Sequence, residues 1–328
     1  MRPLPPLLLP PRLPPGWPTR RPTAVEHSKA LPRITVVTPS YNQAEFLETT
    51  IRSVLEEGYP ALDYYIIDGG SRDASIEIIR HYEPWLSGWV SEPDKGQVDA
   101  IAKGLARAQG DWFNWINSDD LLSPGALWEV ARAPACDLFG GQTQNFYADR
   151  LDRLRVSRDF NARNFIRIPV ESRVRWHQPG IWYRTAALRD VGIDESLHYR
   201  FDLDLLIRYS QRYPKVHYSR ALMAWFRLHG ASKTVSQAAR FEQEHVRLLE
   251  SLLARPGDSA LHGDARDALQ ALAWRSRLEA LQADPRPRLV RARALLAEAR
   301  HVPGAWRINA TAETLNRILF RKRRAPAS

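Results

Sequence analysis

The spacing of hydrophobic positions changes at about residue 31, where short apolar runs begin to alternate with helical stripes. Residues 34–38 form the first apolar run, and the apolar positions of residues 43–57 then recur three and four places apart, as on one helix face. Further elements are expected as strands at residues 64–67, 88–91 and 111–116 and as helices at residues 74–82 and 98–105. This alternation indicates βαβ units, so we predict an α/β fold with a mostly parallel sheet flanked by helices.

Two further regions follow this alternating part. The first keeps mixed strand and helix signals, with a helix at residues 203–209 and a strand near residues 221–226. We place it in the same domain, which spans residues 31–235. The rest, residues 236–328, is strongly helical and predicts a helical extension with a basic C-terminal tail. Its helices are expected at residues 241–252, 269–281 and 289–300, with breaks at proline-containing segments.

The first 30 residues follow neither pattern. Nine prolines lie between Pro3 and Pro22. Proline fixes φ and removes a backbone donor, which excludes a helix or a central strand. We therefore expect residues 1–30 to be a disordered, proline-rich leader.

Charge and cysteine content narrow the setting. The 328 residues carry a formal net charge of +10, which indicates an anionic partner such as nucleic acid, a membrane surface or a phosphorylated substrate. The one cysteine, Cys136, excludes an intrachain disulfide and favours the cytoplasm. No apolar run approaches the roughly 18 residues that span a bilayer, so we expect neither a transmembrane helix nor a signal peptide.

Polar residues follow each of the four predicted parallel strands. The four loops are residues 39–42, 68–71, 92–96 and 117–120. In such sheets ligands bind at the carboxyl ends of the strands, where these loops converge. Any one of them could be an ordinary turn or helix cap. Four in register indicate a site for a nucleotide diphosphate.

The chain resembles the inverting glycosyltransferases of family 2, which have the GT-A fold. The resemblance is carried, in order, by residues 38–43 (TPSYNQ), 50–55 (TIRSVL), 67–73 (IDGGSRD), 91–97 (SEPDKGQ), 117–120 (NSDD), 177–179 (HQP), 194–197 (DESL) and 226–230 (FRLHG). It covers about 200 residues but neither the leader nor the helical extension. It implies a Rossmann-like GT-A sheet for residues 31–235.

The resemblance also implies the residues of the donor pocket. Asp68 accepts hydrogen bonds from the nucleotide base in such enzymes, and Asp94 lines the same pocket. Thr38, Pro39 and Tyr41 form its floor, where an aromatic ring can offer apolar surface to a flat base. Core packing is the alternative explanation for the tyrosine.

Asp119 and Asp120 resemble the metal motif of the family. Mg²⁺ or Mn²⁺ held by carboxylate oxygens would neutralise the departing diphosphate. The position two before Asp119 is Asn117 rather than an acid, so we expect Asp120 to be the principal ligand and Asp119 to contribute to donor binding. A helix cap is the alternative for this pair.

Transfer to a hydroxyl requires a base, and Asp202 is the candidate. It lies six residues before Arg208, as the catalytic aspartate of the family does before its arginine. The family usually has an acid immediately before this aspartate, whereas this chain has Phe201. Asp204 is a weaker alternative base, and a surface acid is the alternative explanation for either aspartate.

A later segment is expected to close over the diphosphate. By resemblance, His229 could ligate the metal and Arg227 could bind phosphate oxygens, although a structural histidine is an equally good explanation. Residues 177–179 are expected on the acceptor or sugar side. The resemblance thus implies a metal-dependent, inverting transfer from a UDP-type donor to a carbohydrate or lipid-linked acceptor, in surface polysaccharide or glycolipid assembly.

Two other classes of function stay open at this point. A nucleotidylyltransferase would also combine an α/β nucleotide domain with metal carboxylates, but it would leave Asp202 unexplained. A non-enzymatic membrane or nucleic-acid module is supported by Arg286, Arg288, Arg291, Arg293 and residues 321–324 (RKRR). These arginines lie outside the motifs, so we expect them to give a peripheral contact with the inner face of the membrane and no nucleic-acid binding.

Overall fold

The computed structural model describes residues 3–18, 30–171, 173–230 and 237–320. The chain divides into two compact units. Unit 1 comprises Met1–Ala162 with Arg175–Phe241, and unit 2 comprises Arg163–Val174 with Glu242–Ser328. The second junction lies near the domain boundary expected at residue 235. No signal in the sequence predicted that residues 163–174 belong to the helical unit.

Unit 1 is built on one mixed sheet, whose nine strands belong to the described residues and follow the order β3-β2-β1-β4-β8-β6-β9-β5, with β7 beside β6. The strands are β1 (Ile34–Ser40), β2 (Leu62–Asp68), β3 (Gly88–Ser91), β4 (Trp112–Trp115), β5 (Leu121–Leu122), β6 (Leu138–Phe146), β7 (Leu151–Val156), β8 (Ile181–Arg184) and β9 (Val216–Arg227). The first four strands are parallel, as predicted. β8 runs antiparallel to both β4 and β6.

The parallel register brings the predicted loops together. Ser40 at the end of β1 pairs with Asp68 at the end of β2. Asp68 in turn pairs with Ser91 at the end of β3. The carboxyl ends of these three strands therefore meet at one edge of the sheet, where ligands bind in such folds.

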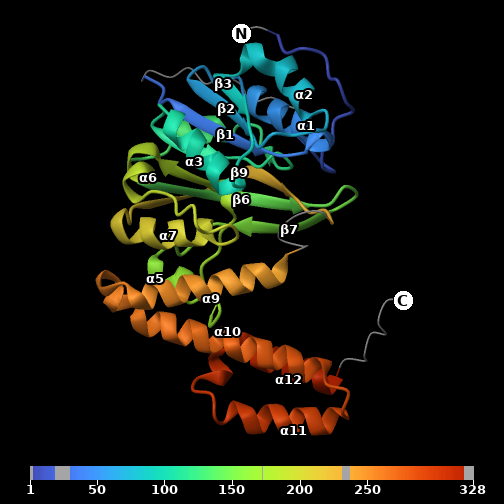
Figure 1. The fold of residues 1–328 in the computed structure, drawn as a ribbon, viewed down its shortest axis with the longest axis vertical. Coiled ribbons are helices and arrows are strands. Elements are labelled where there is room, and N and C mark those ends of the chain that lie inside the picture. The colour runs from blue at the N-terminus through green and yellow to red at the C-terminus, as the bar shows by residue number, and fades with distance from the viewer. Residues whose placement is uncertain (1–2, 19–29, 172, 231–236, 321–328) are drawn as a thin grey trace. The chain divides into compact units, whose positions relative to one another are not determined.

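Helices cover both faces of this sheet (Figure 1). The helices of unit 1 are α1 (Ala44–Leu55), α2 (Ser75–Tyr82), α3 (Gln97–Arg107), α4 (Ala126–Ala131), α6 (Thr185–Val191) and α7 (Phe201–Arg212), with α5 (Ala162–Ile166) at the junction to unit 2. Short 3₁₀ turns lie at Glu83–Trp85 and Gln178–Gly180. The helices predicted at residues 43–57, 74–82 and 98–105 are confirmed as α1, α2 and α3.

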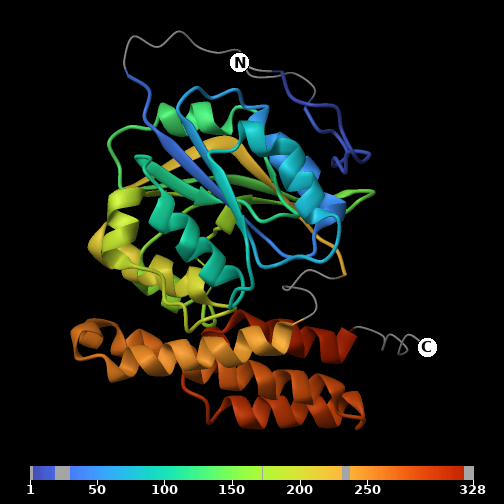
Figure 2. The ribbon, with the colours of Figure 1, turned by 45° about the horizontal axis from the view of Figure 1, so that its top comes forward.

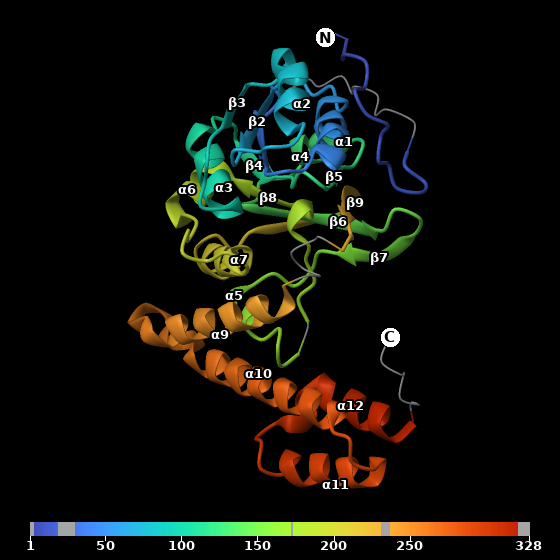
Figure 3. The ribbon, with the colours of Figure 1, turned by 45° about the vertical axis from the view of Figure 1, so that its right-hand side comes forward.

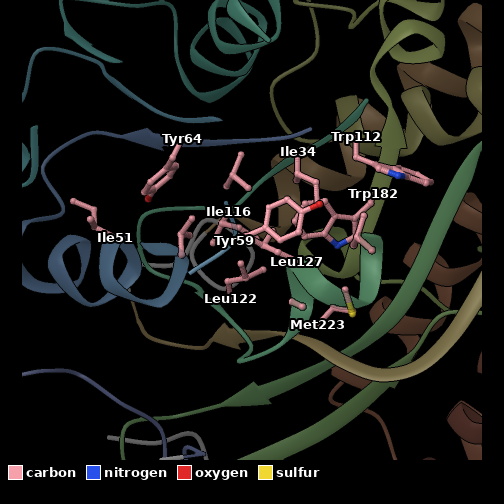
Figure 4. Close-up of a cluster of buried hydrophobic side chains, with 14 of the residues drawn as sticks. Ile34, Ile51, Tyr59, Tyr64, Trp112, Ile116, Leu122, Leu127, Trp182 and Met223 are labelled. Atoms are coloured by element: carbon pink, nitrogen blue, oxygen red, sulfur yellow. The ribbon is translucent and has the colours of Figure 1, made fainter. Parts of the chain in front are cut away.

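Alternate residues of β1 face different helices, as the pleat of a strand requires. Ile34 and Val36 belong to the buried cluster that also contains apolar residues of α1, α2 and α4 (Figure 4). Val37 faces α3 instead, where a Cβ on Gly104 would lie 2.5 Å from its Cγ1. Only a glycine lets α3 approach the strand this closely.

Unit 2 is helical, as predicted for the extension. It contains α10 (His262–Ala283), α11 (Arg288–Ala299), α12 (Asn309–Phe320), most of α9 (Ala238–Ala254) and 3₁₀ turns at Pro256–Leu261 and Ala305–Arg307. Its core joins α10, α11 and α12 through side chains such as Trp274, Leu295 and Ile318. Arg163 and Arg167 connect the segment before residue 174 to Asp264 of α10, at 2.8 and 3.1 Å. No helix of the described residues is long and apolar enough to cross a membrane.

The start of the chain differs from the expected disordered leader. Residues 3–18 lie against α1 and α2 with defined hydrogen bonds, and Figure 3 shows this dark-blue segment beside both helices. Prolines exclude regular secondary structure, as predicted, but their carbonyls and the remaining amides can bind side chains of a folded domain. The rest of the predicted leader lies largely outside the described residues.

Candidate functional site

Asp68 connects three loops at the carboxyl edge of the sheet. Its Oδ2 accepts hydrogen bonds from the backbone amides of Gly70 and Ser71, at 3.0 and 2.8 Å, and from the hydroxyl of Ser91 at 2.7 Å. Its Oδ1 accepts the hydroxyl of Ser71 at 2.5 Å. The carboxylate is fully buried. Since two carboxylate oxygens offer about four acceptor positions, the protein fills most of them itself.

Asp94 lies against the same loop. A Cβ on Gly69 would be 2.9 Å from its Oδ2, so the absence of a side chain at residue 69 lets the carboxylate reach the backbone next to Asp68. Its Oδ1 accepts the amide of Gly96 at 2.8 Å. Burial is the largest cause that raises the pKa of Asp94. The structure therefore brings the two predicted pocket acids together.

The loop after β1 completes this side of the site. Thr38 is buried and its hydroxyl is 2.9 Å from that of Tyr64, so it holds the strand end in place. Pro39 lies next to it in the buried strand. The side chain of Tyr41 is 57% exposed, which excludes the core-packing explanation for this ring. The amide of Asn42 donates to the hydroxyl of Ser71 at 2.7 Å and links the first two loops.

The two neighbouring acids after β4 have opposite environments. Asp120 is 1% exposed, and its two oxygens accept the amide of Arg227 at 3.0 Å and the side-chain amide of Asn117 at 3.1 Å. Burial, followed by the nearby charge of Asp119, raises the pKa of Asp120 well above its ordinary value. Its backbone carbonyl accepts the hydroxyl of Thr50 on α1 at 2.7 Å. Asp120 thus fixes the turn from within.

Asp119 points to the accessible side of the same turn. Its Oδ2 lies 2.9 Å from Nε2 of His229, and the two side chains are 22% and 20% exposed. The ring of His229 lies 5.0 Å from that of Phe46 on α1. The predicted acid and histidine, 110 residues apart in sequence, therefore come together.

This pair suits a divalent cation better than Asp120 does. Carboxylate oxygen suits Mn²⁺, and a neutral imidazole nitrogen is a common metal ligand in proteins. Asp119 and His229 share an accessible position, whereas both oxygens of Asp120 are already used and buried. The described residues contain no cluster of three or more His, Cys, Asp or Glu that could hold a metal. Donor oxygens would have to supply the remaining ligands, as is usual for Mg²⁺ bound with phosphates.

Arg227 turns toward the protein rather than toward solvent. Its Nε donates to the carbonyl of Asp119 at 2.8 Å, and an Nη donates to the carbonyl of Arg12. Its guanidinium lies 4.7 and 4.6 Å from the ring centres of Phe46 and Phe146. Burial is the main cause that lowers its pKa. The geometry makes Arg227 a support for the Asp119–Asp120 turn, which differs from the expected phosphate ligand.

Asp202 is the second residue of α7 and lies at the same end of the sheet. The neighbouring Phe201 ring contacts Trp115, the last residue of β4, at 5.9 Å between centroids. Asp202 is partly exposed, and Oδ1 accepts the amide of Leu203 at 2.8 Å. Burial is the main cause that raises the pKa of Tyr183, and the charge of Asp202 is the next cause. Phe201 therefore has a packing role in unit 1.

The alternative base, Asp204, has a structural environment. It is 1% exposed and forms an ion pair with Arg208 at 2.6 Å. Arg208 also donates to the carbonyls of Val191 and Gly192, so the pair ties α7 to the end of α6. A carboxylate held in this way is a poor candidate for proton transfer with a substrate. The geometry therefore favours Asp202.

The 177–179 segment lies on the same strand end. Gln178 is buried and donates to the side-chain oxygen of Asn114 and the carbonyl of Trp115, at 3.1 and 2.8 Å. Asn114 donates in return to the carbonyl of Pro179 at 3.0 Å. Asn114 and Thr50 were not predicted as support for the site. A buried polar residue inside an apolar strand was the signal available for Asn114.

Comparison with known proteins adds to this geometry. Residues 35–192 match the family described as glycosyl transferase family 2. The chain is 30% identical over 187 residues to an uncharacterized glycosyltransferase of Mycobacterium tuberculosis, covering 54% of this chain and 68% of that protein. It is 35% identical over 92 residues to the putative teichuronic acid biosynthesis glycosyltransferase TuaG of Bacillus subtilis, covering 27% and 36% of the two chains.

Two solved structures share the fold at low sequence identity. Staphylococcus aureus TarS 1-349 in complex with UDP-GlcNAc matches with a TM-score of 0.60 and 14% identity, over 87% of this chain and 90% of that one. The mannosyltransferase PcManGT from Pyrobaculum calidifontis, in complex with GDP-Man and Mn²⁺, matches with a TM-score of 0.54 and 18% identity, over 90% of both chains.

Proposed function

Since the chain belongs to glycosyl transferase family 2 and has the GT-A fold, we propose that this glycosyltransferase moves a sugar from a nucleoside-diphosphate donor to an acceptor hydroxyl, with inversion and with a divalent cation. The observation that carries this proposal is the pair of Asp119 and His229, 2.9 Å apart and accessible. The pair follows β4 and β9, at the carboxyl edge where Asp68 and Asp94 also lie.

The residues of this edge divide the chemistry. Asp119 and His229 would hold Mg²⁺ or Mn²⁺, which when bound neutralises charge on the departing diphosphate. Asp202 accepts the proton of the acceptor hydroxyl while the oxygen of that hydroxyl bonds to the anomeric carbon. The bond between this carbon and the diphosphate breaks in the same step. Attack opposite to the leaving group inverts that carbon. Arg227 and Asp120 keep the turn in place without contacting the substrate.

The donor pocket is proposed at the Asp68 side. The exposed ring of Tyr41 can stack on a base, and the buried Thr38 and Pro39 support the strand end beneath it. We propose that a base N–H approaches Oδ1 of Asp68, which among the described residues accepts a hydrogen bond from Ser71 alone, and Asp94 lies beside it. We propose a UDP-type nucleotide sugar. Two structural neighbours, TarS and PcManGT, were solved in complex with UDP-GlcNAc and GDP-Man, which supports a nucleotide-sugar donor.

The acceptor is proposed by analogy with relatives. One is named for teichuronic acid biosynthesis in Bacillus subtilis, and another, a chondroitin synthase of Escherichia coli, is 24% identical over 239 residues. Both names refer to polysaccharides. We therefore propose a carbohydrate or lipid-linked acceptor in surface polysaccharide or glycolipid assembly.

Substitution of the base tests the mechanism. Asp202→Asn keeps the size of the side chain but cannot accept the proton, so turnover should fall by roughly 100-fold or more. Binding of UDP with Mn²⁺, measured by calorimetry, should change little. Asp149→Asn, an exposed acid in the turn between β6 and β7, is the matched control. Full turnover by Asp202→Asn would remove this residue from the mechanism.

Product analysis separates the rival enzyme class. Incubation with nucleotide sugars and a panel of acceptors should release a nucleoside diphosphate with an inverted glycoside. Release of pyrophosphate from a nucleoside triphosphate would instead support a nucleotidylyltransferase. Retention of configuration at the anomeric carbon would overturn the inverting mechanism.

A peripheral membrane contact is proposed for α11. Leu289, Arg293, Leu296 and Arg300 follow one another at helical spacing and are all exposed, Leu289 by 69%. Apolar and cationic side chains on one helix face fit the surface of an anionic bilayer at the cytoplasmic side. Three of the predicted arginines have other partners: Arg291 is buried beside Gln282, Arg286 pairs with Asp284, and Arg288 donates to the carbonyl of Leu319 at 3.5 Å. Residues 321–324 lie outside the described residues.

Vesicle sedimentation tests this contact. The full chain should bind vesicles with phosphatidylglycerol and should bind phosphatidylcholine vesicles weakly. Leu289→Glu with Leu296→Glu should release it, while Leu154→Glu, an exposed leucine of β7 in unit 1, should not. Equal binding of all three chains would exclude α11 as the contact. Binding to duplex DNA in the same salt would support the nucleic-acid alternative.

A further inference from the structure

Residues 3–18, here called the strap, attach to a buried acid of α1. The amides of Leu8 and Leu9 donate to the two carboxylate oxygens of Glu48, at 2.8 and 2.7 Å. The hydroxyl of Tyr82 also donates to this carboxylate, at 3.0 Å. Glu48 is 2% exposed. Burial of a carboxylate without hydrogen-bond donors costs free energy, so the strap amides stabilise Glu48 in its buried position.

Four further contacts fix the path of the strap. The amide of Arg12 donates to the hydroxyl of Thr49 at 3.0 Å, one residue after Glu48. Side chains of Arg52 and His81 lie 2.9 Å from the carbonyls of Pro5 and Pro6. Near its end the ring of Trp17 lies 5.7 Å from that of Trp225 on β9. A proline-rich segment suits this role because it is already extended and loses little entropy on binding.

The strap also reaches the proposed cation site. The carbonyl of Arg12 accepts a hydrogen bond from the guanidinium of Arg227. The same guanidinium donates to the carbonyl of Asp119, and the backbone amide of Arg227 donates to the side chain of Asp120. α1 supports this turn from another side, since Thr50 donates to the carbonyl of Asp120. One helix therefore holds both the strap and the turn that carries Asp119.

We propose that the strap positions the Asp119–His229 pair through Arg12 and Arg227, with Glu48 as its attachment point. The strap contacts no proposed substrate group, so its residues are positioning residues. The proposal rests on the proposed function, because the pair is the cation site of that function. Release of the strap removes an acceptor from Arg227 and loosens the turn, so it should weaken cation binding more than it changes the chemical step.

Limited trypsin digestion tests the attachment. Cleavage after Arg12, followed by mass spectrometry, reports how often the strap leaves α1, because the bound backbone does not fit a protease. Glu48→Gln turns one acceptor into a donor and should increase this rate by about tenfold. Glu77→Gln, an exposed acid of α2, is the matched control and should leave it unchanged. An unchanged rate in Glu48→Gln would overturn Glu48 as the attachment point.

Manganese binding tests the positioning role. Leu8→Pro with Leu9→Pro removes the two amides that bind Glu48, and Leu7→Pro imposes the same backbone restriction where no hydrogen bond is lost. With UDP present, Mn²⁺ affinity measured by electron paramagnetic resonance should fall by roughly tenfold in the double variant alone. Turnover at saturating Mn²⁺ should change much less. Should the double variant fail to fold, Glu48→Gln is measured in the same way.

The outcomes are distinguishable. Faster cleavage after Arg12 with unchanged Mn²⁺ affinity would show that the strap serves stability alone and would overturn the positioning role. An equal loss of turnover and stability without a shift in Mn²⁺ affinity would do the same. Absence of Mn²⁺ binding in the unaltered protein would overturn the proposed cation site together with this role, while the cleavage rates would still report attachment.

Discussion

The two ends of the proposed site are built in different ways. On the nucleotide side, Asp68 is held by Gly70, Ser71 and Ser91, which lie at or just after the carboxyl ends of neighbouring parallel strands. On the cation side, Asp119 depends on His229 and Arg227, more than 100 residues further along the chain. The nucleotide side is thus a product of consecutive βα loops. The cation side forms only when distant segments have come together, so distant substitutions should affect it most.

The largest expected effect separates the two acids of the cation side. Asp119→Asn should lower turnover by roughly 1000-fold, because a divalent cation contributes several kcal/mol to neutralising the leaving group. Asp120→Asn should instead destabilise the fold by about 1–3 kcal/mol, since it disturbs buried hydrogen bonds. Activity against Mn²⁺ concentration and urea unfolding measure the two effects. A greater loss of Mn²⁺ affinity in Asp120→Asn would reverse this assignment and return to the order expected from the sequence.

A smaller effect is expected on the nucleotide side. Gly69→Ala places a Cβ 2.9 Å from an oxygen of Asp94, so that carboxylate must move. A displacement of this kind should lower kcat/KM for the donor by roughly 10- to 100-fold. Gly257→Ala in unit 2, where a Cβ would meet nothing within 4 Å, is the control. A normal KM for the donor would mean that Asp94 does not line the pocket.

The smallest effect on turnover is expected at a buried acid outside both ends of the site. The two oxygens of Glu57 accept the amides of Gly125 and Leu127, at 2.6 and 3.0 Å, and burial raises its pKa to about 7. The unfolded chain has the ordinary, lower pKa, so the folded state binds more protons between the two values. The stabilisation is therefore present below pH 4.5 and is lost as pH rises through about 7.

Urea unfolding between pH 4.5 and 8 measures this contribution. The free energy of unfolding should fall by about 3 kcal/mol at most over that interval, and the fall should be smaller in Glu57→Gln. Turnover at fixed pH should differ little between the two folded proteins. An unchanged slope in Glu57→Gln would assign the pH dependence to other groups.

The sequence predicted the parallel half of unit 1 because its signals are local. The apolar run at residues 34–38 is enough to predict a strand. An acid at the end of a parallel strand is then expected at the carboxyl edge of the sheet. Asp119 and Asp120 could not be told apart in this way. They are neighbours in sequence, and their environments are set by the backbone of Arg227 and the side chain of Asn117.

The same limit applies to the two ends of the chain. The prolines correctly excluded helix and central strand in residues 3–18, yet nothing local showed that Glu48, 40 residues after Leu8, would bind their amides. α12 is a further case. Its apolar positions at residues 315, 318 and 319 fit a helix, but its place in the unit 2 core depends on contacts with α10 and α11. Figure 2 shows these helices packed together in orange and red.

The contact between Arg12 and Arg227 has a consequence for how the protein is made. It joins residues 215 positions apart, so the strap cannot complete its contacts until Arg227 has also left the ribosome. At about 5–20 residues per second this delay is on the order of ten seconds or more. Complete attachment of the strap would therefore report that the sheet has formed. A nascent chain halted before β9 would lack Arg227 as the hydrogen-bond donor to Arg12.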